Sequence, residues 1–214
     1  MVKILNVDVK SPRVDVIVEA AATIREGGLV VYPTETVYGL GADAVSEEAV
    51  AKVFAIKARP IENPIPIAVD SIDMAREIIE LNRLAEMLFE RFLPGPLTIV
   101  GKVKPRSISK LVTGGTGKVG IRIPDNKVAL KLVEFVGGPI TATSANLSGS
   151  PAPITAREAL EQLGRNVDLA LDSGRCEVGR PSTVVDVSSG EPKIIREGPI
   201  AGSELKKLLM ELKI

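Results

Sequence analysis

Apolar positions along the chain change repeatedly between the period of a strand and the period of a helix. Residues 29–32 form a short, continuous apolar run that is typical of a buried strand, and residues 119–123 alternate as a strand does. Between such runs, apolar side chains recur at helical spacing. The first predicted helix carries its apolar face on Val14, Ile17, Val18, Ala21 and Ile24. This alternation predicts an α/β or α+β fold, in which helices flank a mixed β-sheet.

Capping residues mark where several predicted helices begin. Ser46, Ser71 and Asn82 each precede a helical repeat, and Thr155 with Glu158 has the spacing of a capping box. Further strands are predicted at residues 66–69, 97–103, 139–143, 167–171, 183–187 and 193–196, and further helices at residues 125–136 and from Ser203 onward. No segment has the composition of a linker between domains, so we expect a single domain over residues 1–214.

The absence of histidine narrows the possible chemistry. Without histidine, and with Cys176 as the only cysteine, the chain has no Ser-His-Asp or Cys-His nucleophile and no typical zinc site. A disulfide within the chain is excluded, and no segment resembles a signal peptide or a membrane span, so we expect a soluble, cytoplasmic protein. With 27 basic and 27 acidic residues, the chain has no overall charge to attract nucleic acid. Catalysis would have to depend on positioning, local charge and backbone donors.

Two polar segments in the first third of the chain are candidates for ligand contact. Residues 33–41 follow the apolar strand at once and combine hydroxyls, a carboxylate and two glycines, which fits a ligand-binding turn; a helix-capping turn is the alternative. Residues 57–60 place Lys57 and Arg59 at the end of the helix that begins at Ser46. Both cations could bind a polyphosphate, or they could simply interact with the negative end of the helix dipole.

Two more candidates lie in the second half. Lys118 and Arg122 are four apart in a predicted strand and therefore share a face, with Gly120 between them, which indicates an anion site or else a solvated sheet face. Residues 114–118 read Gly-Gly-Thr-Gly-Lys, but they lack the leading glycine and the following Ser or Thr of a phosphate-binding P-loop. Residues 143–149 follow a strand with hydroxyl and amide side chains, which suits ribose or phosphate recognition, or else a helix N-cap.

Taken together, these segments resemble the YrdC family of threonylcarbamoyl-AMP synthases. The matching segments are YPTETVYGLG (32–41), KARP (57–60), LPGPLTIV (93–100), VGIRIP (119–124), TATSANLSG (141–149), PSTVVD (181–186) and IIREG (194–198). Each segment alone is weak, whereas their order and spacing over most of the chain are specific. The resemblance implies a YrdC-like (RibB-like) fold, with a twisted mixed sheet flanked by helices and an open, positively charged cleft.

The resemblance also implies a reaction and a set of site residues. L-Threonine, bicarbonate and ATP would give threonylcarbamoyl-AMP and pyrophosphate, with Mg²⁺ accompanying ATP and no direct protein ligand for the metal. A separate transferase complex would then modify a tRNA adenosine. The implied ATP-binding residues are Lys57, Arg59, Asn63, Lys118, Ser144, Asn146 and Arg196. The implied threonine-binding residues are Thr34, Thr36, Arg122, Ala142, Thr143 and Ser182, and the implied catalytic residues are Lys57, Arg59 and Arg122.

One position departs from the family pattern, and two other functions remain open. Many members carry a histidine eleven residues after the lysine of the KxR motif, where this chain has Ala68. Ala68 favours, as one alternative, a nucleotide-binding YrdC paralogue with a different acceptor. The other alternative is a double-stranded RNA-binding protein that uses the same cleft, although zero net charge and few aromatic residues argue against RNA binding. Contact with tRNA is possible under either reading.

Overall fold

The strands form two β-sheets in the computed structural model of the chain, which describes residues 2–189 and 191–211. The five-stranded sheet has the order β1-β9-β2-β3-β8, and the six-stranded sheet has the order β11-β10-β5-β6-β4-β7. Each sheet contains parallel and antiparallel pairs, which confirms the mixed α/β class. The sequence predicted one mixed sheet, whereas the structure has two. Local sequence patterns identify strands but do not show which strands pair.

The strand bounds agree with most of the predicted ranges. The five-stranded sheet contains β1 (Lys3–Asn6), β2 (Val30–Tyr32), β3 (Gly39–Gly41), β8 (Thr143–Ser144) and β9 (Leu169–Asp172). The six-stranded sheet contains β4 (Ile67–Ala68), β5 (Leu97–Lys102), β6 (Lys118–Arg122), β7 (Ile140–Thr141), β10 (Thr183–Asp186) and β11 (Lys193–Arg196). β1 and β3 were not predicted, and the strand predicted at residues 139–143 is divided into β7 and β8.

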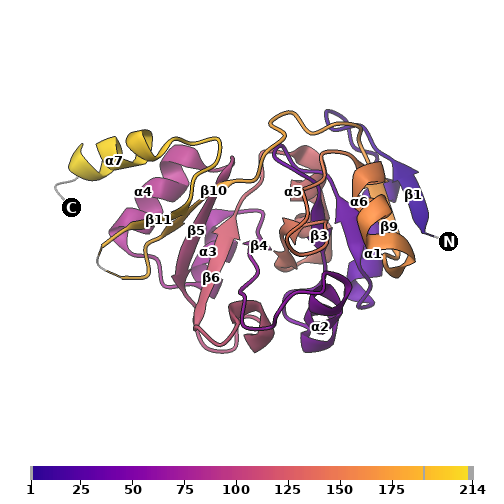
Figure 1. Cartoon of the computed structure of the whole chain (residues 1–214), viewed down its shortest axis with the longest axis horizontal. Helices are drawn as coiled ribbons and strands as arrows, with labels where there is room; N and C mark the ends of the chain where they lie inside the picture. The colour runs from indigo at the N-terminus through magenta and orange to yellow at the C-terminus, as the bar shows by residue number, and fades with distance from the viewer. Residues whose placement is uncertain (1, 190, 212–214) are drawn as a thin grey trace.

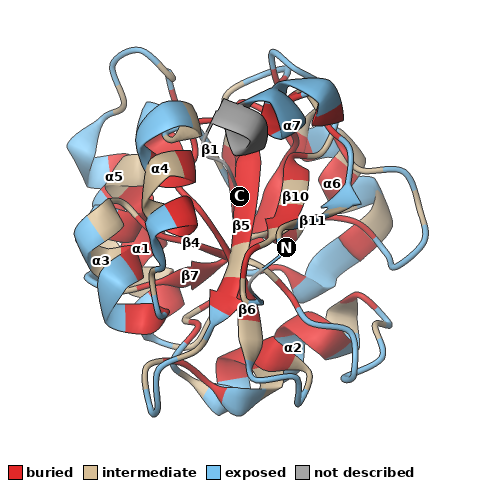
Figure 2. Cartoon of the chain, turned by 90° about the vertical axis from the view of Figure 1, so that its left-hand side faces the viewer, coloured by how far each residue is buried: buried red, intermediate tan, exposed pale blue. Residues whose placement is uncertain are grey.

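Helices cover the outer faces of both sheets. The α-helices are α1 (Val14–Arg25), α2 (Glu47–Ile56), α3 (Ile72–Ile78), α4 (Arg83–Phe92), α5 (Lys127–Val136), α6 (Ala156–Leu163) and α7 (Gly202–Glu211), and the short 3-10 helices are η1 (Lys110–Thr113) and η2 (Gly164–Asn166). In Figure 1, α3, α4 and α7 lie with the six-stranded sheet on the left, and α1, α5 and α6 lie with the five-stranded sheet on the right. Figure 2 shows buried strands behind helices whose outer faces are exposed. Among the described residues, no helix has the length and apolar character that a membrane crossing requires.

The predicted helix starts are confirmed at four caps, whereas the buried face of α1 is not the predicted one. The side chains of Ser46, Ser71, Asn82 and Thr155 each accept a hydrogen bond from a backbone N–H in the first turn. In α1, Val14 and Val18 remain exposed, while Val16, Ile17, Ala20, Ala21 and Ile24 are buried. Residues 14–18 contain four apolar side chains in five positions, so the sequence alone does not fix which side of this helix faces the core.

The chain passes from one sheet to the other at Ala142. β7 ends at Thr141 in the six-stranded sheet, and β8 begins at Thr143 in the five-stranded sheet. The Ala142 N–H donates to the carbonyl of Pro66 (2.8 Å), and the Thr141 hydroxyl donates to the carbonyl of Leu40 (2.7 Å). We refer to this place as the sheet junction. It brings the ends of several strands together and so creates an edge where a ligand can bind.

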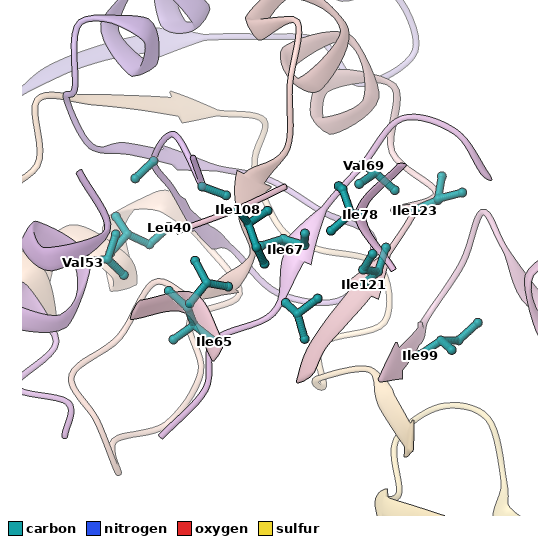
Figure 3. Close-up of a cluster of buried hydrophobic side chains, with 14 of the residues drawn as sticks. Leu40, Val53, Ile65, Ile67, Val69, Ile78, Ile99, Ile108, Ile121 and Ile123 are labelled. Atoms are coloured by element: carbon teal, nitrogen blue, oxygen red, sulfur yellow. The ribbon is translucent and has the colours of Figure 1, made fainter. Parts of the chain in front are cut away.

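A hydrophobic core continues across the junction. Leu40 of the five-stranded sheet and Ile67, Ile99 and Ile121 of the six-stranded sheet belong to one buried cluster, part of which Figure 3 shows. A second cluster, which includes Ile17 and Leu132, lies between α1, α5 and the five-stranded sheet. The continuous core makes both sheets a shared, rigid support for the residues at their junction.

Candidate active site

Two adjoining pockets lie beside the sheet junction. The large pocket has a volume of about 470 Å³, and the small pocket has a volume of about 130 Å³. Arg59, Pro66 and Arg196 line both pockets, so these residues form a common wall. The large pocket is in the range of sizes that hold cofactors and other small molecules, whereas the small one suits only a fragment the size of an amino acid. Together they suit a ligand pair that meets at the common wall.

The floor of the large pocket is one face of the six-stranded sheet. It is made by alternate residues of three neighbouring strands, Thr98 and Val100 of β5, Lys118 and Gly120 of β6, and Val184 and Asp186 of β10. At Gly120, an added Cβ would lie 2.8 Å from the Thr98 methyl carbon, so only glycine fits this close approach between the strands. Lys118 and Asp186 form an ion pair (3.2 Å) at the edge of this otherwise mainly apolar floor.

The end of α2 directs Arg59 into the common wall. Ala58 adopts a left-handed conformation (φ 47°), which ends the helix, and a non-glycine residue in this conformation costs about 1–2 kcal/mol. Arg59 then donates from Nε to the carbonyl of Asn63 (3.1 Å) and from Nη2 to the carbonyl of Pro64 (2.9 Å). Backbone strain of this kind often marks a functional position, and here it fixes a guanidinium at both pockets.

Arg196 reaches the same wall from β11. Its Nε and Nη2 donate to the carbonyl of Ser182 (3.1 and 2.8 Å), and the Ser182 hydroxyl is hydrogen bonded to the Thr98 hydroxyl (2.8 Å). The turn after β11 is held by Thr183, whose Oγ1 accepts from the N–H of Gly198 (2.9 Å). The two family-like segments PSTVVD and IIREG therefore support each other and place Arg196.

The positive charges of Arg59 and Arg196 are not neutralised by acidic side chains. Among the side chains that the structure describes, neither arginine takes part in an ion pair, and both are braced by carbonyl oxygens. Burial lowers the pKa of Arg59, and burial followed by the charge of Arg122 lowers the pKa of Arg196. Arg59 is half-buried and Arg196 is exposed, and both guanidinium groups are held in place beside the two pockets, where they can bind an anion. The common wall is therefore suited to phosphate groups.

Lys57 is buried beneath the pockets rather than exposed in them. Only 1% of the residue is accessible, and it lines neither pocket. Its ammonium donates to the carbonyls of Ser144 and Asn146 (2.5 and 2.6 Å) and to the Asn146 side-chain oxygen (3.2 Å). Burial, and next the charge of Arg59, lower the pKa of Lys57 to about 8. An ammonium has three protons, so these bonds occupy all of them and fix the turn after β8.

A buried ion pair lies behind the small pocket. Arg122, which lines this pocket at the end of β6, donates from Nη2 to Oε1 of Glu35 (2.6 Å) and from Nη1 to the hydroxyl of Thr36 (3.0 Å). Thr34 donates its hydroxyl proton to the carbonyl of Val37 (2.6 Å), so Thr36 must be the donor in its bond to Thr34 (2.8 Å). The hydrogen bonds therefore all point the same way: Arg122 donates to Thr36, Thr36 donates to Thr34, and Thr34 donates to a backbone carbonyl.

Two atoms of this ion pair lack partners. Arg122 Nε and Glu35 Oε2 are buried and, in the part of the chain that the structure describes, make no hydrogen bond. Most buried polar atoms in proteins are paired, so these two atoms need an explanation, such as a catalytic role or a bound water or ion. Arg122 also lines the small pocket and has N–H groups besides the two that bond to Glu35 and Thr36.

Eight of the thirteen residues implied by the resemblance line the two pockets. The pockets are lined by Arg59, Lys118, Arg122, Ala142, Thr143, Ser144, Ser182 and Arg196. Behind this lining lie Lys57, Asn146, Thr34 and Thr36, which bond to lining residues or to the turns that carry them, whereas Asn63 is exposed and supplies only its carbonyl to Arg59. No group of three or more acidic, Cys or His side chains in the described ranges could hold a metal ion.

Several residues that line the pockets were not among the predicted site residues. Thr98, Val100, Val184 and Asp186 form most of the floor, and Pro66 lines both pockets. The strand alternation contained the signal for the floor, since residues two apart in the predicted strands 97–103 and 183–187 share one face. Nothing in the local sequence indicated that these two strands pair with each other.

Comparison with known proteins identifies the family. The family model for Sua5, YciO and YrdC proteins, described as telomere recombination, matches residues 22–198. Curated threonylcarbamoyl-AMP synthases from Pyrococcus abyssi and Bacillus subtilis are 41% and 38% identical over 91% and 90% of this chain. The structure of P. abyssi Sua5 complexed with L-threonine is 40% identical and superimposes on 96% of this chain with a TM-score of 0.92. The chain belongs to the Sua5/YciO/YrdC family.

The chain spans only part of the length of the relatives that it matches. The chain spans 57% and 56% of the lengths of the P. abyssi and B. subtilis synthases, and 60% of the P. abyssi Sua5 structure. Residues 22–198, which the family model covers, include both sheets except β1 and all the residues that line the two pockets. The family similarity and the pocket geometry therefore concern the same part of the chain.

Ala68, the position at which this chain departs from the family's histidine, lies in the core. Ala68 is fully buried in β4 and pairs with Arg122 of β6, but it lines neither pocket. Its neighbours in the second hydrophobic cluster include Tyr32, whose pKa is raised by burial. Because Ala68 is fully buried, a larger side chain at this position would force its neighbours to move.

Proposed function

We propose that the chain is an L-threonylcarbamoyladenylate synthase, which converts L-threonine, bicarbonate and ATP to threonylcarbamoyl-AMP, pyrophosphate and water. The observation that carries this proposal is the pair of adjoining pockets with uncompensated Arg59 and Arg196 in their common wall. A nucleotide fits the size of the large pocket, and an amino acid with one added carboxylate fits that of the small pocket. Curated synthases of the same family support this assignment.

In the proposed arrangement, the nucleotide lies on the floor of the large pocket. The apolar side chains of Val100 and Val184 would contact the base and ribose, and Lys118 would lie at the polar edge. The phosphates would then reach Arg59 and Arg196 at the common wall. Ser144, in the turn that Lys57 fixes, lines the small pocket, and its hydroxyl oxygen can accept a hydrogen bond from a ribose hydroxyl while its proton bonds to Asn146.

Threonine would occupy the small pocket as its N-carboxylated derivative. The free donors of Arg122 suit its α-carboxylate, and the hydroxyls of Thr143 and Ser182 suit its other polar atoms. This pocket is bounded by both sheets, so the position of the amino acid is set by the sheet junction. The new carboxylate would then point toward the common wall, where the α-phosphate lies.

The reaction needs alignment and charge neutralisation rather than a protein nucleophile. The neutral amine of threonine adds to carbon dioxide derived from bicarbonate, and a carbamate oxygen attacks the α-phosphorus. The bond from the α-phosphorus to the bridging oxygen breaks, and pyrophosphate leaves with that electron pair. Two anions must therefore be held together, which the cations of the common wall would favour in a partly desolvated site. This accords with a chain that contains no histidine.

Mg²⁺ would enter this reaction with ATP and not as a resident of the protein. The pockets contain a single carboxylate, Asp186, and it is already paired with Lys118. Such a donor set does not fit an all-protein magnesium site, but magnesium commonly binds through substrate phosphates with few protein ligands.

We propose further that the product passes to a separate transferase complex, which uses it to modify tRNA in the cytoplasm.

The proposal is tested by measuring pyrophosphate release with ATP, Mg²⁺ and bicarbonate. Release should depend on L-threonine and should be much slower with valine, which has the same shape but lacks the hydroxyl. Release that is independent of the amino acid, or that requires a different one, would favour a paralogue with another acceptor. High affinity for double-stranded RNA that falls steeply with salt, without threonine-dependent turnover, would favour the RNA-binding alternative.

A further inference from the structure

The buried ion pair between Glu35 and Arg122 joins the two sheets at the small pocket. Glu35 lies in the turn between β2 and β3 of the five-stranded sheet, and Arg122 is the last residue of β6 in the six-stranded sheet. Only 7% of Glu35 and 5% of Arg122 is accessible, and their closest oxygen and nitrogen are 2.6 Å apart. The pair therefore fixes one wall of the small pocket against the other.

The turn that carries Glu35 is fixed independently of Arg122. Its carbonyl accepts from the N–H of Val178 (2.9 Å), and the carbonyl of Thr36 accepts from the N–H of Gly179 (3.0 Å). The Thr34 hydroxyl bonds within the same turn. Arg122 extends from the end of a strand, whereas Glu35 is carried by a turn whose backbone is braced on both sides of the carboxylate. In this pair, Glu35 sets the position of the arginine.

We propose that Glu35 is a positioning residue for the amino-acid substrate, acting through Arg122. It holds two nitrogens of the guanidinium, together with Thr36, and leaves the remaining N–H groups for a substrate carboxylate in the small pocket. This inference rests on the proposed function for the nature of the substrate. Its distinct content is that a residue which lines neither pocket determines how well threonine binds.

The physical reason is the cost of leaving a buried cation without a counter-charge. Arg122 is too buried for water to solvate its charge. Removing one member of a buried ion pair therefore leaves the other charge uncompensated. An arginine released from Glu35 would turn toward other acceptors, and the two-point geometry that a carboxylate needs would be lost. Binding in the large pocket should change little, because Arg59 and Arg196 are held by backbone carbonyls of other segments and Lys118 is paired with Asp186.

The decisive variant is Glu35→Gln, which keeps the shape and one acceptor oxygen but removes the charge. Its KM for threonine in the pyrophosphate-release assay should rise about tenfold, equivalent to about 1.4 kcal/mol, and its KM for ATP should change less than about twofold. Glu177→Gln, on an exposed residue beside the same turn, is the matched control and should match the wild type. In a chain that carries Arg122→Gln, adding Glu35→Gln should have almost no further effect on the threonine KM.

Other outcomes overturn the proposal. An unchanged threonine KM in Glu35→Gln, equal rises for threonine and ATP with a lower melting temperature, or additive effects in the double variant would each show that Glu35 does not act through Arg122. If the wild type has no threonine-dependent turnover, the proposed function fails, and side-chain ¹⁵N NMR of Arg122 then decides. Loss of its separately resolved Nη signals in Glu35→Gln would keep the positioning role, and unchanged signals would refute it.

Discussion

Replacing Lys57 with methionine tests whether its buried ammonium holds the turn after β8. The variant keeps the long apolar stem and removes only the charged donor. The carbonyl of Asn146 loses the donor that pairs it, while the carbonyl of Ser144 keeps its bond from the Asn146 N–H (2.9 Å) and the Asn146 side-chain oxygen keeps its bond from the Ser144 hydroxyl (2.6 Å). One orphaned acceptor costs about 1–3 kcal/mol, and two weakened ones add to that. We therefore expect a loss of about 2–3 kcal/mol.

Urea denaturation measures this loss directly. With a slope of about 2 kcal/mol per molar, the midpoint of Lys57→Met should fall by roughly 1 M relative to the wild type, while Lys110→Met, on an exposed lysine, should leave it unchanged. ATP should also stabilise Lys57→Met less than it stabilises the wild type, since the turn that carries Ser144 is no longer fixed. A midpoint equal to that of the wild type, together with equal stabilisation by ATP, would show that the Lys57 ammonium does not hold the turn after β8.

The pH dependence of the stability difference between the wild type and Lys57→Met tests whether the pKa of Lys57 is lowered in the folded chain. The pKa of Lys57 is lowered to about 8 in the folded chain, whereas an unfolded lysine titrates near 10.4. Between these values the unfolded chain binds more protons, so the wild type gains stability as pH rises. Lys57→Met lacks this group, so the difference between the two should widen from pH 8 to pH 10, by at most about 1.4 kcal/mol per pH unit. A constant or shrinking difference would contradict the lowered pKa.

Three further substitutions test other parts of the site. Arg59→Ala should lose most of the stabilisation by saturating ATP, about 2.7 kcal/mol at a hundred times the Kd, whereas Lys110→Ala should keep it; thermal shifts with and without ATP compare them. Gly198→Ala should lower stability by about 1–3 kcal/mol in urea titrations, because its Cβ would lie 2.5 Å from the carbonyl oxygen of Pro181. Ala68→His should also lower the melting temperature without improving the threonine KM, because position 68 is fully buried and outside both pockets. A lower KM in that variant would show that the core opens to the small pocket.

The parts of the site that the sequence predicted are those fixed by local chemistry. Ser46 and Thr155 cap helices because a hydroxyl before a helical repeat satisfies free backbone N–H groups. Lys118 and Arg122 share a face because a strand alternates, and both line a pocket. Such features depend on a few neighbouring residues, so their pattern can be read without the fold.

The parts that the sequence did not predict depend on contacts between distant segments. Lys57 has the residue type of a phosphate ligand, but its partners are 87 and 89 positions away and turn its ammonium inward. Glu35 and Arg122 are likewise 87 positions apart, so neither segment alone indicates their pairing. The division into two sheets at Ala142 depends on which strands pair, and residues 139–143 give no local sign of it.

In the proposed reaction, the two pockets together join an adenylate to a carboxylated threonine. Mass spectrometry of the product formed from ATP, L-threonine and carbon-13-labelled bicarbonate tests this reaction. We expect an AMP adduct that contains threonine and the labelled carbon, formed only when all three substrates are present. An adduct without the label, such as threonyl-AMP, or pyrophosphate release with no adduct of threonine, would contradict it.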